Sequence, residues 1–172
     1  MKTILFPVVF LISIIDSNAQ SLKKYAVSNS GCSLYSYCDT KFKMEKSEDS
    51  SSVYTGECTK DEISYGIICV KLLNPVHILT MAEDLLISYA DYLKQSFEIT
   101  KAAGYGKGHR LNNDENTRGI LDYWEDKDLD KWKIKAWTDG NYIGFMYVYS
   151  KKELPEAKVN AFLDSFRLPG MK

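Results

Sequence analysis

The sequence predicts an α+β domain in which an antiparallel β-sheet is packed by one long α-helix and one short C-terminal α-helix. Strand-like segments occur in two groups, one before and one after a long amphipathic stretch at 81–100. Asp139-Gly140 separates two alternating segments, as in a β-hairpin. The 172-residue chain is 45 % hydrophobic and 13 % aromatic, which is a composition that folds around a core.

Residues 1–19 have the features of a cleaved signal peptide. Met1-Lys2 gives a positive start, residues 4–15 are almost wholly apolar, and Ser17-Asn18-Ala19 supplies the small residues that signal peptidase recognises. The apolar run is shorter than the ~20 residues of a membrane-spanning helix. We therefore expect a secreted or periplasmic protein whose residues 20–172 form a single α+β domain without a transmembrane segment. An uncleaved N-terminal anchor is the alternative.

The charge balance and the cysteines narrow the expected partners and the redox state. A formal net charge of −1 provides no global field that would attract nucleic acid, so no nucleic-acid partner is expected. The even number of cysteines favours two disulfides in an oxidising compartment, and buried free thiols are the alternative. Three pairings are open, and no CxxC spacing predicts zinc or thioredoxin chemistry. The four candidates are Cys32, Cys38, Cys58 and Cys69.

The segments before the long helix read as strands separated by loops. Residues 21–31 form a polar lead-in, and the aromatic segment 32–44 predicts a strand with a bend. The Ser/Glu/Asp cluster at 45–52 predicts a loop. A hairpin is then expected from two β-type runs, 53–58 and 65–73, joined through 59–62.

The long helix is expected from Met81 to Thr100. Thr80 fits an N-cap, and Glu83 three residues later would complete a capping box. Apolar residues then recur at helical spacing on one face: Ala82, Leu85, Leu86, Tyr89, Leu93 and Phe97. The glycine-rich segment Gly104–Gly108 predicts a loop after the helix.

The second half predicts a closing hairpin with a defined register. If Asp139-Gly140 is a two-residue turn, Ile134 lies opposite Phe145 and one face of both strands is apolar. Residues 120–125 predict a third strand. A final helix is expected after Pro155, with an apolar stripe of Val159, Phe162, Leu163 and Phe166.

This order of elements resembles the PsbP-like fold, shared by the extrinsic photosystem PsbP proteins and the Mog-type Ran-binding proteins. The matching features are an N-terminal hairpin, a long amphipathic helix, the glycines of 104–108, an Arg-containing strand at 118–124, and a terminal helix that reads Phe162-Leu163-Asp164-Ser165-Phe166. The resemblance implies a binding or assembly module rather than an enzyme. It is an analogy of fold, and fold alone does not establish function.

Catalytic and cofactor motifs are weak in this chain. Of the two histidines, His77 is expected at the surface, whereas His109 after the glycine loop could join Asp122 or Glu125 in a small secreted hydrolase. No GxSxG or HExxH motif is present, and the glycine loop follows a helix instead of preceding one, unlike a phosphate site. Carboxylates at 125, 126, 128 and 130 alternate as in a calcium loop but lack its central Gly and terminal Glu. No cofactor or metal is therefore predicted.

One set of aromatic and basic residues is the candidate binding surface. It would work only if the second face of the closing hairpin is open to solvent, and the alternative is that a helix covers it and the rings are core. An open surface would suit an envelope protein, a peptide or a glycan, so the sequence favours a non-catalytic binding or assembly module. The candidate residues are Tyr105, His109, Trp124, Lys135, Trp137 and Tyr142.

We predict that signal peptidase cleaves between Ala19 and Gln20. The positive start, apolar run and small residues together form its recognition pattern. Intact-mass analysis of protein recovered from the native host should show a chain that begins at Gln20. A mass that retains residues 1–19 would contradict the prediction.

Overall fold

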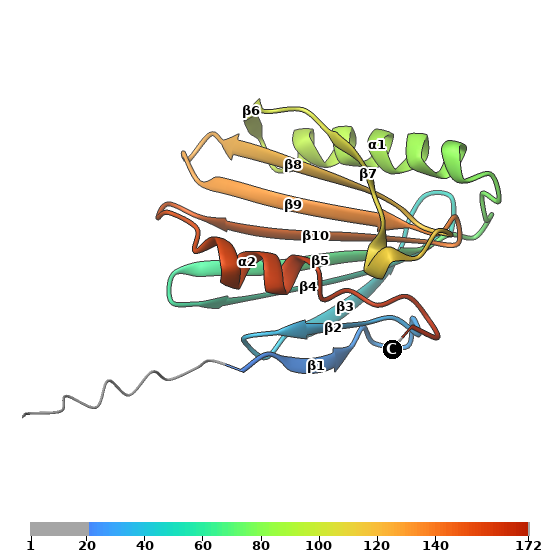
Figure 1. The fold of residues 1–172 in the computed structure, drawn as a ribbon, viewed down its shortest axis with the longest axis horizontal. Coiled ribbons are helices and arrows are strands. Elements are labelled where there is room, and N and C mark those ends of the chain that lie inside the picture. Colours follow the sequence, from blue (N-terminus) through green and yellow to red (C-terminus); the bar gives the residue numbers. More distant parts are fainter. Residues whose placement is uncertain (1–20, 172) are drawn as a thin grey trace, which may run out of the picture.

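The computed structural model describes residues 21–171 (Figure 1). The predicted signal peptide lies outside the described residues. The main sheet is antiparallel, in the order β3-β4-β5-β10-β9-β8-β6 with β7 also pairing with β8, and a smaller sheet consists of β1 and β2. The strands are β1 (Lys23–Ala26), β2 (Ser33–Ser36), β3 (Lys41–Lys46), β4 (Ser52–Lys60), β5 (Ile63–Lys71), β6 (Ile99–Ala102), β7 (Gly106–His109), β8 (Arg118–Asp126), β9 (Lys131–Thr138) and β10 (Tyr142–Ser150). The helices are α1 (Leu79–Ser96) and α2 (Glu156–Leu163), with a short 3-10 turn at Leu111–Asn113.

The protein is a β-rich fold, so the predicted α+β class of a sheet packed by a long and a short helix is wrong. Strands account for 44 % of the described residues and helices for 19 %. The prediction missed β1 within the polar lead-in, β6 at the expected end of the helix, and β7 within the glycine loop. Each has only four residues, most of them exposed, so none carries the alternating pattern that identifies a strand in a sequence.

Helix α1 begins and ends earlier than the sequence predicts. Its N-cap is Ile78, which makes no side-chain hydrogen bond, so the predicted Thr80–Glu83 capping box is wrong. After Ser96, Glu98 takes a positive φ of 53° and turns the chain back into β6. Thr100 therefore lies in a strand. Among residues 21–171, no helix is long and apolar enough to cross a membrane.

The main sheet is covered on both faces, and each face has its own core. Side chains alternate along β10, so Phe145 and Met146 lie on opposite faces. Phe145 belongs to a cluster with α1 residues Leu86, Ala90 and Leu93. Met146 belongs to a second cluster that includes the apolar stripe of α2 and extends to the β1–β2 sheet. Figure 1 shows α1 along the β6–β8 side of the sheet and α2 beside β10 and β5.

The β9–β10 hairpin is confirmed, but its register differs from the prediction by two residues. Phe145 pairs with Ala136 rather than with Ile134, and Ile143 pairs with Thr138. The turn is wider than two residues because the Asp139 carboxylate accepts hydrogen bonds from the backbone N–H groups of Asn141 and Tyr142, each at 2.8 Å. A shift of two keeps every side chain on its face, so Ile134 and Phe145 share the apolar face as predicted.

One of the two expected disulfides is present. Cys38–Cys58 joins the segment after β2 to β4, with the two Cα atoms 5.9 Å apart, and so connects the small sheet to the main sheet. Cys32 and Cys69 are buried and do not form a disulfide. The neighbouring Cys32 thiol and burial raise the pKa of the Cys69 thiol, which favours its neutral form.

We predict that Gly140→Ala destabilises the protein much more than Gly108→Ala does. Both glycines have similar positive φ values, 83° and 85°. A Cβ at Gly140 would collide with the backbone carbonyl of Val76, whereas nothing lies within 4 Å of a Cβ at Gly108. Gly108→Ala should therefore cost about 1 kcal/mol of conformational strain, and Gly140→Ala roughly 3 kcal/mol.

Chemical denaturation of the two variants measures the difference in free energy of unfolding. Equal losses would show that the contact between Gly140 and Val76 does not constrain the fold.

Candidate functional site

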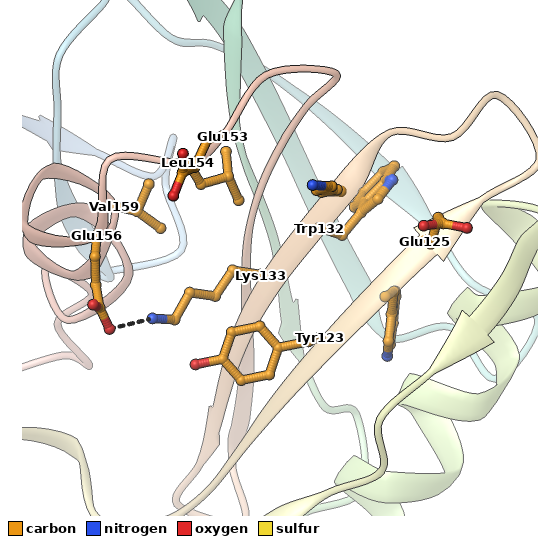
Figure 2. Close-up of a pocket in the computed structure, with 10 residues that line it drawn as sticks. Tyr123, Glu125, Trp132, Lys133, Glu153, Leu154, Glu156 and Val159 are labelled. Atoms are coloured by element: carbon orange, nitrogen blue, oxygen red, sulfur yellow. Dashed lines mark ion pairs between the residues drawn. The ribbon is translucent and has the colours of Figure 1, made fainter.

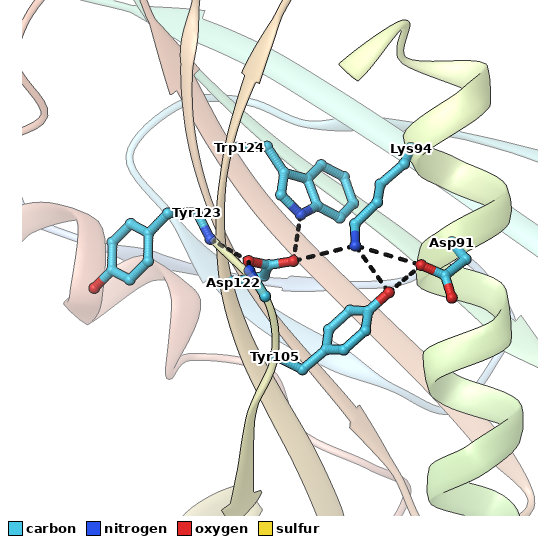
Figure 3. A network of polar contacts seen from close by, with 7 residues as sticks. Asp91, Lys94, Tyr105, Asp122, Tyr123 and Trp124 are labelled. Atoms are coloured by element: carbon cyan, nitrogen blue, oxygen red, sulfur yellow. Dashed lines mark hydrogen bonds and ion pairs between the residues drawn. The ribbon is translucent and has the colours of Figure 1, made fainter. Parts of the chain in front are cut away.

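The most elaborate polar arrangement is a network around the fully buried Asp122 on β8 (Figure 3). One carboxylate oxygen accepts hydrogen bonds from the backbone N–H groups of Gly104 at 3.0 Å and Tyr123 at 2.8 Å. The other accepts from Trp124 Nε1 at 2.6 Å and lies 3.5 Å from the Lys94 ammonium. A buried carboxylate needs such partners to remain charged, and Asp122 has four.

Lys94 extends the network from α1 to the glycine-rich segment. Its ammonium donates a hydrogen bond to the Tyr105 hydroxyl at 2.8 Å and contacts Asp91 at 3.3 Å, and Tyr105 also donates to Asp91. Burial acts to lower the pKa of Lys94, but the contacts with Tyr105 and Asp122 raise it above its usual value. Lys94 is therefore a cation that joins α1, β8 and the turn before β7.

Two of the predicted site residues, Tyr105 and Trp124, belong to this network. The Lys94 ammonium lies 4.2 Å from the centroid of the Tyr105 ring and 5.6 Å from that of Trp124. Because the donors and acceptors of Asp122 and Lys94 are matched with one another, the network's role is to fasten α1 to the sheet. Trp124 is buried, whereas Tyr105 is only partly buried.

The predicted open face at Trp137 is part of the core, which corrects the sequence hypothesis for that residue. Trp137 is 3 % exposed and packs in the cluster that contains Leu111 and Phe166. The segment between β7 and β8 and the chain after α2 cover it. Tyr142 is partly buried and donates a hydrogen bond to the Ser30 carbonyl. Lys135 pairs with Asp164 at 2.6 Å.

His109 does not have the surroundings that the hydrolase hypothesis requires. It lies on β7 opposite Gly119 of β8. Asp122 points to the face of the sheet covered by α1, where Lys94 holds it. Within residues 21–171, no hydrogen bond or ion pair joins His109 to a carboxylate, so no acid–base pair is assembled around this imidazole.

The alternating carboxylates at 125–130 form a turn. Asp126 is buried and accepts hydrogen bonds from the backbone N–H groups of Asp128 and Asp130 and from Trp132 Nε1, at 2.9–3.0 Å. In the part of the chain that the structure describes, no group of three or more His, Cys, Asp or Glu side chains is arranged to hold a metal ion.

The candidate binding surface that the structure does show is an apolar stripe on α1. Four large side chains on this helix and at its start remain exposed and recur at helical spacing: Ile78, Met81, Leu85 and Tyr92. They lie beside the buried stripe of Ala82, Leu86, Ala90 and Leu93, so the apolar surface of α1 is wider than the sheet covers. Exposed apolar side chains gathered along one element are typical of interaction sites.

A groove separates this stripe from the β3–β4 turn. Two adjoining cavities, of about 540 and 220 Å³, share Ser47, Asp49, Val53 and Tyr89 in their walls. The smaller cavity is mainly apolar and includes Leu72, Leu85 and Ile143, and the larger reaches Tyr92. Burial raises the pKa of Tyr89 to about 12, so its phenol is neutral at physiological pH. We call this region the α1 groove.

The rim of the α1 groove is acidic. Glu45, Glu48 and Asp49 line the larger cavity, and Lys46 is the single cation among its lining residues. The Lys46 ammonium is held by Ser50 and Ser52, at 3.1 and 2.9 Å. Within residues 21–171, none of the three carboxylates forms an ion pair, so the rim carries uncompensated negative charge.

Comparison of the chain with protein-family models and with curated proteins gives no match, and the PsbP-like resemblance therefore stays a prediction from the sequence.

The α1 groove was missed because the sequence pattern shows only that α1 is apolar on one wide face. How much of that face the sheet covers depends on the placement of β4 and β5 in the sheet, which the sequence of α1 does not reveal.

We predict that Asp122→Asn costs roughly 3 kcal/mol in free energy of unfolding, because it leaves Lys94 and three hydrogen-bond donors without their buried anion. The matched control is Glu125→Gln on the same strand, whose exposed pair with Lys101 should contribute less than about 1 kcal/mol. Denaturant unfolding monitored by tryptophan fluorescence tests both. Similar losses would contradict the structural role assigned to Asp122.

Proposed function

We propose that this protein is a non-catalytic binding domain that acts outside the cytoplasm and holds a segment of a partner protein in the α1 groove. The observation that carries this proposal is the exposed apolar stripe of α1, two of whose residues, Leu85 and Tyr92, line two adjoining cavities. Binding would release the water that contacts these side chains. Each Å² of apolar surface that is buried would contribute roughly 25 cal/mol of favourable free energy.

The chemistry of the groove favours one kind of partner. The smaller cavity suits an aliphatic or aromatic side chain, because its walls are almost entirely apolar. The larger cavity suits a lysine or arginine next to that side chain, because three carboxylates without ion pairs among residues 21–171 and the rings of Tyr89 and Tyr92 surround it. The proposed occupant is therefore a basic, apolar peptide segment.

The proposed location rests on the signal-peptide pattern of residues 1–19 and is supported by the Cys38–Cys58 disulfide. Disulfides persist in oxidising compartments such as the periplasm and the extracellular space. An envelope protein is thus a suitable source of the segment.

A random-peptide display library selected on the purified protein tests this function. We expect the enriched peptides to carry lysine or arginine beside leucine, phenylalanine or tryptophan. Their affinity should fall by about tenfold or more in the variant Leu85→Asp/Tyr92→Ala, which removes two apolar groove residues. Tyr92 is 62 % exposed, so the variant should still fold.

The control variant is Leu129→Asp, which replaces a leucine that is 67 % exposed in the β8–β9 turn, away from the groove. Its peptide affinity should equal that of the unchanged protein. Enrichment of acidic peptides, failure to enrich any motif, or retention of affinity in the groove variant would each overturn the proposal.

A further inference from the structure

A separate cavity of about 400 Å³ lies on the other side of the sheet, between strands β8 and β9 and the start of α2 (Figure 2). Tyr123 and Lys133 project into it from neighbouring strands, where they form a cross-strand pair. Leu154 and Val159 form its apolar wall on the α2 side. This volume falls within the usual range for small-molecule sites, roughly 300–1,000 Å³.

Lys133 is the unusual residue in this cavity. The residue is only 6 % exposed, yet its ammonium has a single ionic partner within residues 21–171, Glu156, at 3.5 Å. The Tyr123 ring lies beside the ammonium, with its centroid 5.2 Å away. An ammonium has three N–H donors, and a single 3.5 Å contact with one carboxylate leaves donors available to a ligand in the cavity.

Glu156 is a weak partner that a ligand can replace. Its side chain is 79 % exposed, so moving it into solvent requires no change in the core. It is also the first residue of α2, whose N-cap, Pro155, makes no side-chain capping bond. The positive end of the helix dipole at this first turn favours an anion at the same end of the cavity.

Lys135, on the same strand, is a lysine whose ammonium has a close ion-pair partner. It lies two residues along β9, on the same face, and its ammonium contacts both carboxylate oxygens of Asp164 at 2.6 and 2.8 Å. Within residues 21–171, Lys133 has no comparable partner, although it is equally well placed on the strand. The contrast leaves Lys133 able to pair with a carboxylate from outside the chain.

We propose that this cavity binds a small amphipathic monocarboxylate, with the carboxylate on Lys133 and the apolar body against Leu154, Val159 and the Tyr123 ring. The carboxylate forms a charge-assisted hydrogen bond with the ammonium and displaces Glu156. The apolar body is small enough for these existing walls to cover it. This site is independent of the α1 groove, which lies on the opposite face of the sheet.

Isothermal titration calorimetry with octanoate, 1-octanol and octylammonium tests the proposal. Octanoate should bind most tightly, 1-octanol more weakly because it lacks the charge, and octylammonium most weakly. Lys133→Met should reduce octanoate affinity about tenfold or more and leave 1-octanol affinity unchanged. Binding of 1-octanol also shows that the variant retains its cavity.

Two further variants sharpen the result. Glu156→Gln should strengthen octanoate binding about threefold, because it removes the competing carboxylate, and Lys135→Met should leave it unchanged. Equal binding of octanoate and 1-octanol, preference for octylammonium, weakened binding in Glu156→Gln, or no binding of any probe at about millimolar concentration would each overturn the proposal.

Discussion

The rest of the structure depends on β10, a central strand that is buried on both faces. It lies between β5 and β9, and only its first residue and Tyr149 are even partly exposed. Such a strand is stable only if both sides of the sheet are covered, because water would otherwise contact Phe145 on one side and Met146 on the other. The two helices and the small β1–β2 sheet therefore provide the cover that this strand requires. Binding can occur at the surfaces that these elements leave uncovered.

Close approach of aromatic rings to glycines completes both cores. The Trp137 ring lies directly on Gly119, the Tyr147 ring on Gly66, and the Phe166 ring on Gly144. In the first two cases the ring and the glycine are cross-strand partners, so a missing side chain on one strand makes room for a large one on the next. This packing explains why Trp137, which the sequence offered as a surface residue, is instead held inside the molecule.

Local signals were enough to predict much of the fold but not its class. The β9–β10 hairpin, the β4–β5 hairpin, the strand near 120–125 and the stripe of α2 follow from turn chemistry and periodicity, which act within a few residues. The exact register of β9–β10 depended on the Asp139 side chain bonding two backbone N–H groups, which a turn motif does not reveal. The short strands β1, β6 and β7 exist because neighbouring strands supply their hydrogen bonds, so their own sequences carry almost no signal.

The candidate sites were beyond prediction for the same reason, since each is defined by a partner that is present or absent across the sheet. Lys133 and Lys135 are indistinguishable in sequence, being lysines at alternate positions of one strand. They differ because the end of α2 brings Asp164 to Lys135, whereas its exposed first residue, Glu156, is all that the helix brings to Lys133. An ion pair whose polar groups have hydrogen-bond partners, like Asp122 with Lys94, stabilises the fold. A buried charge with too few polar partners lowers the stability of the fold. A ligand that supplies the missing partner removes this cost, and the free energy that is recovered contributes to binding.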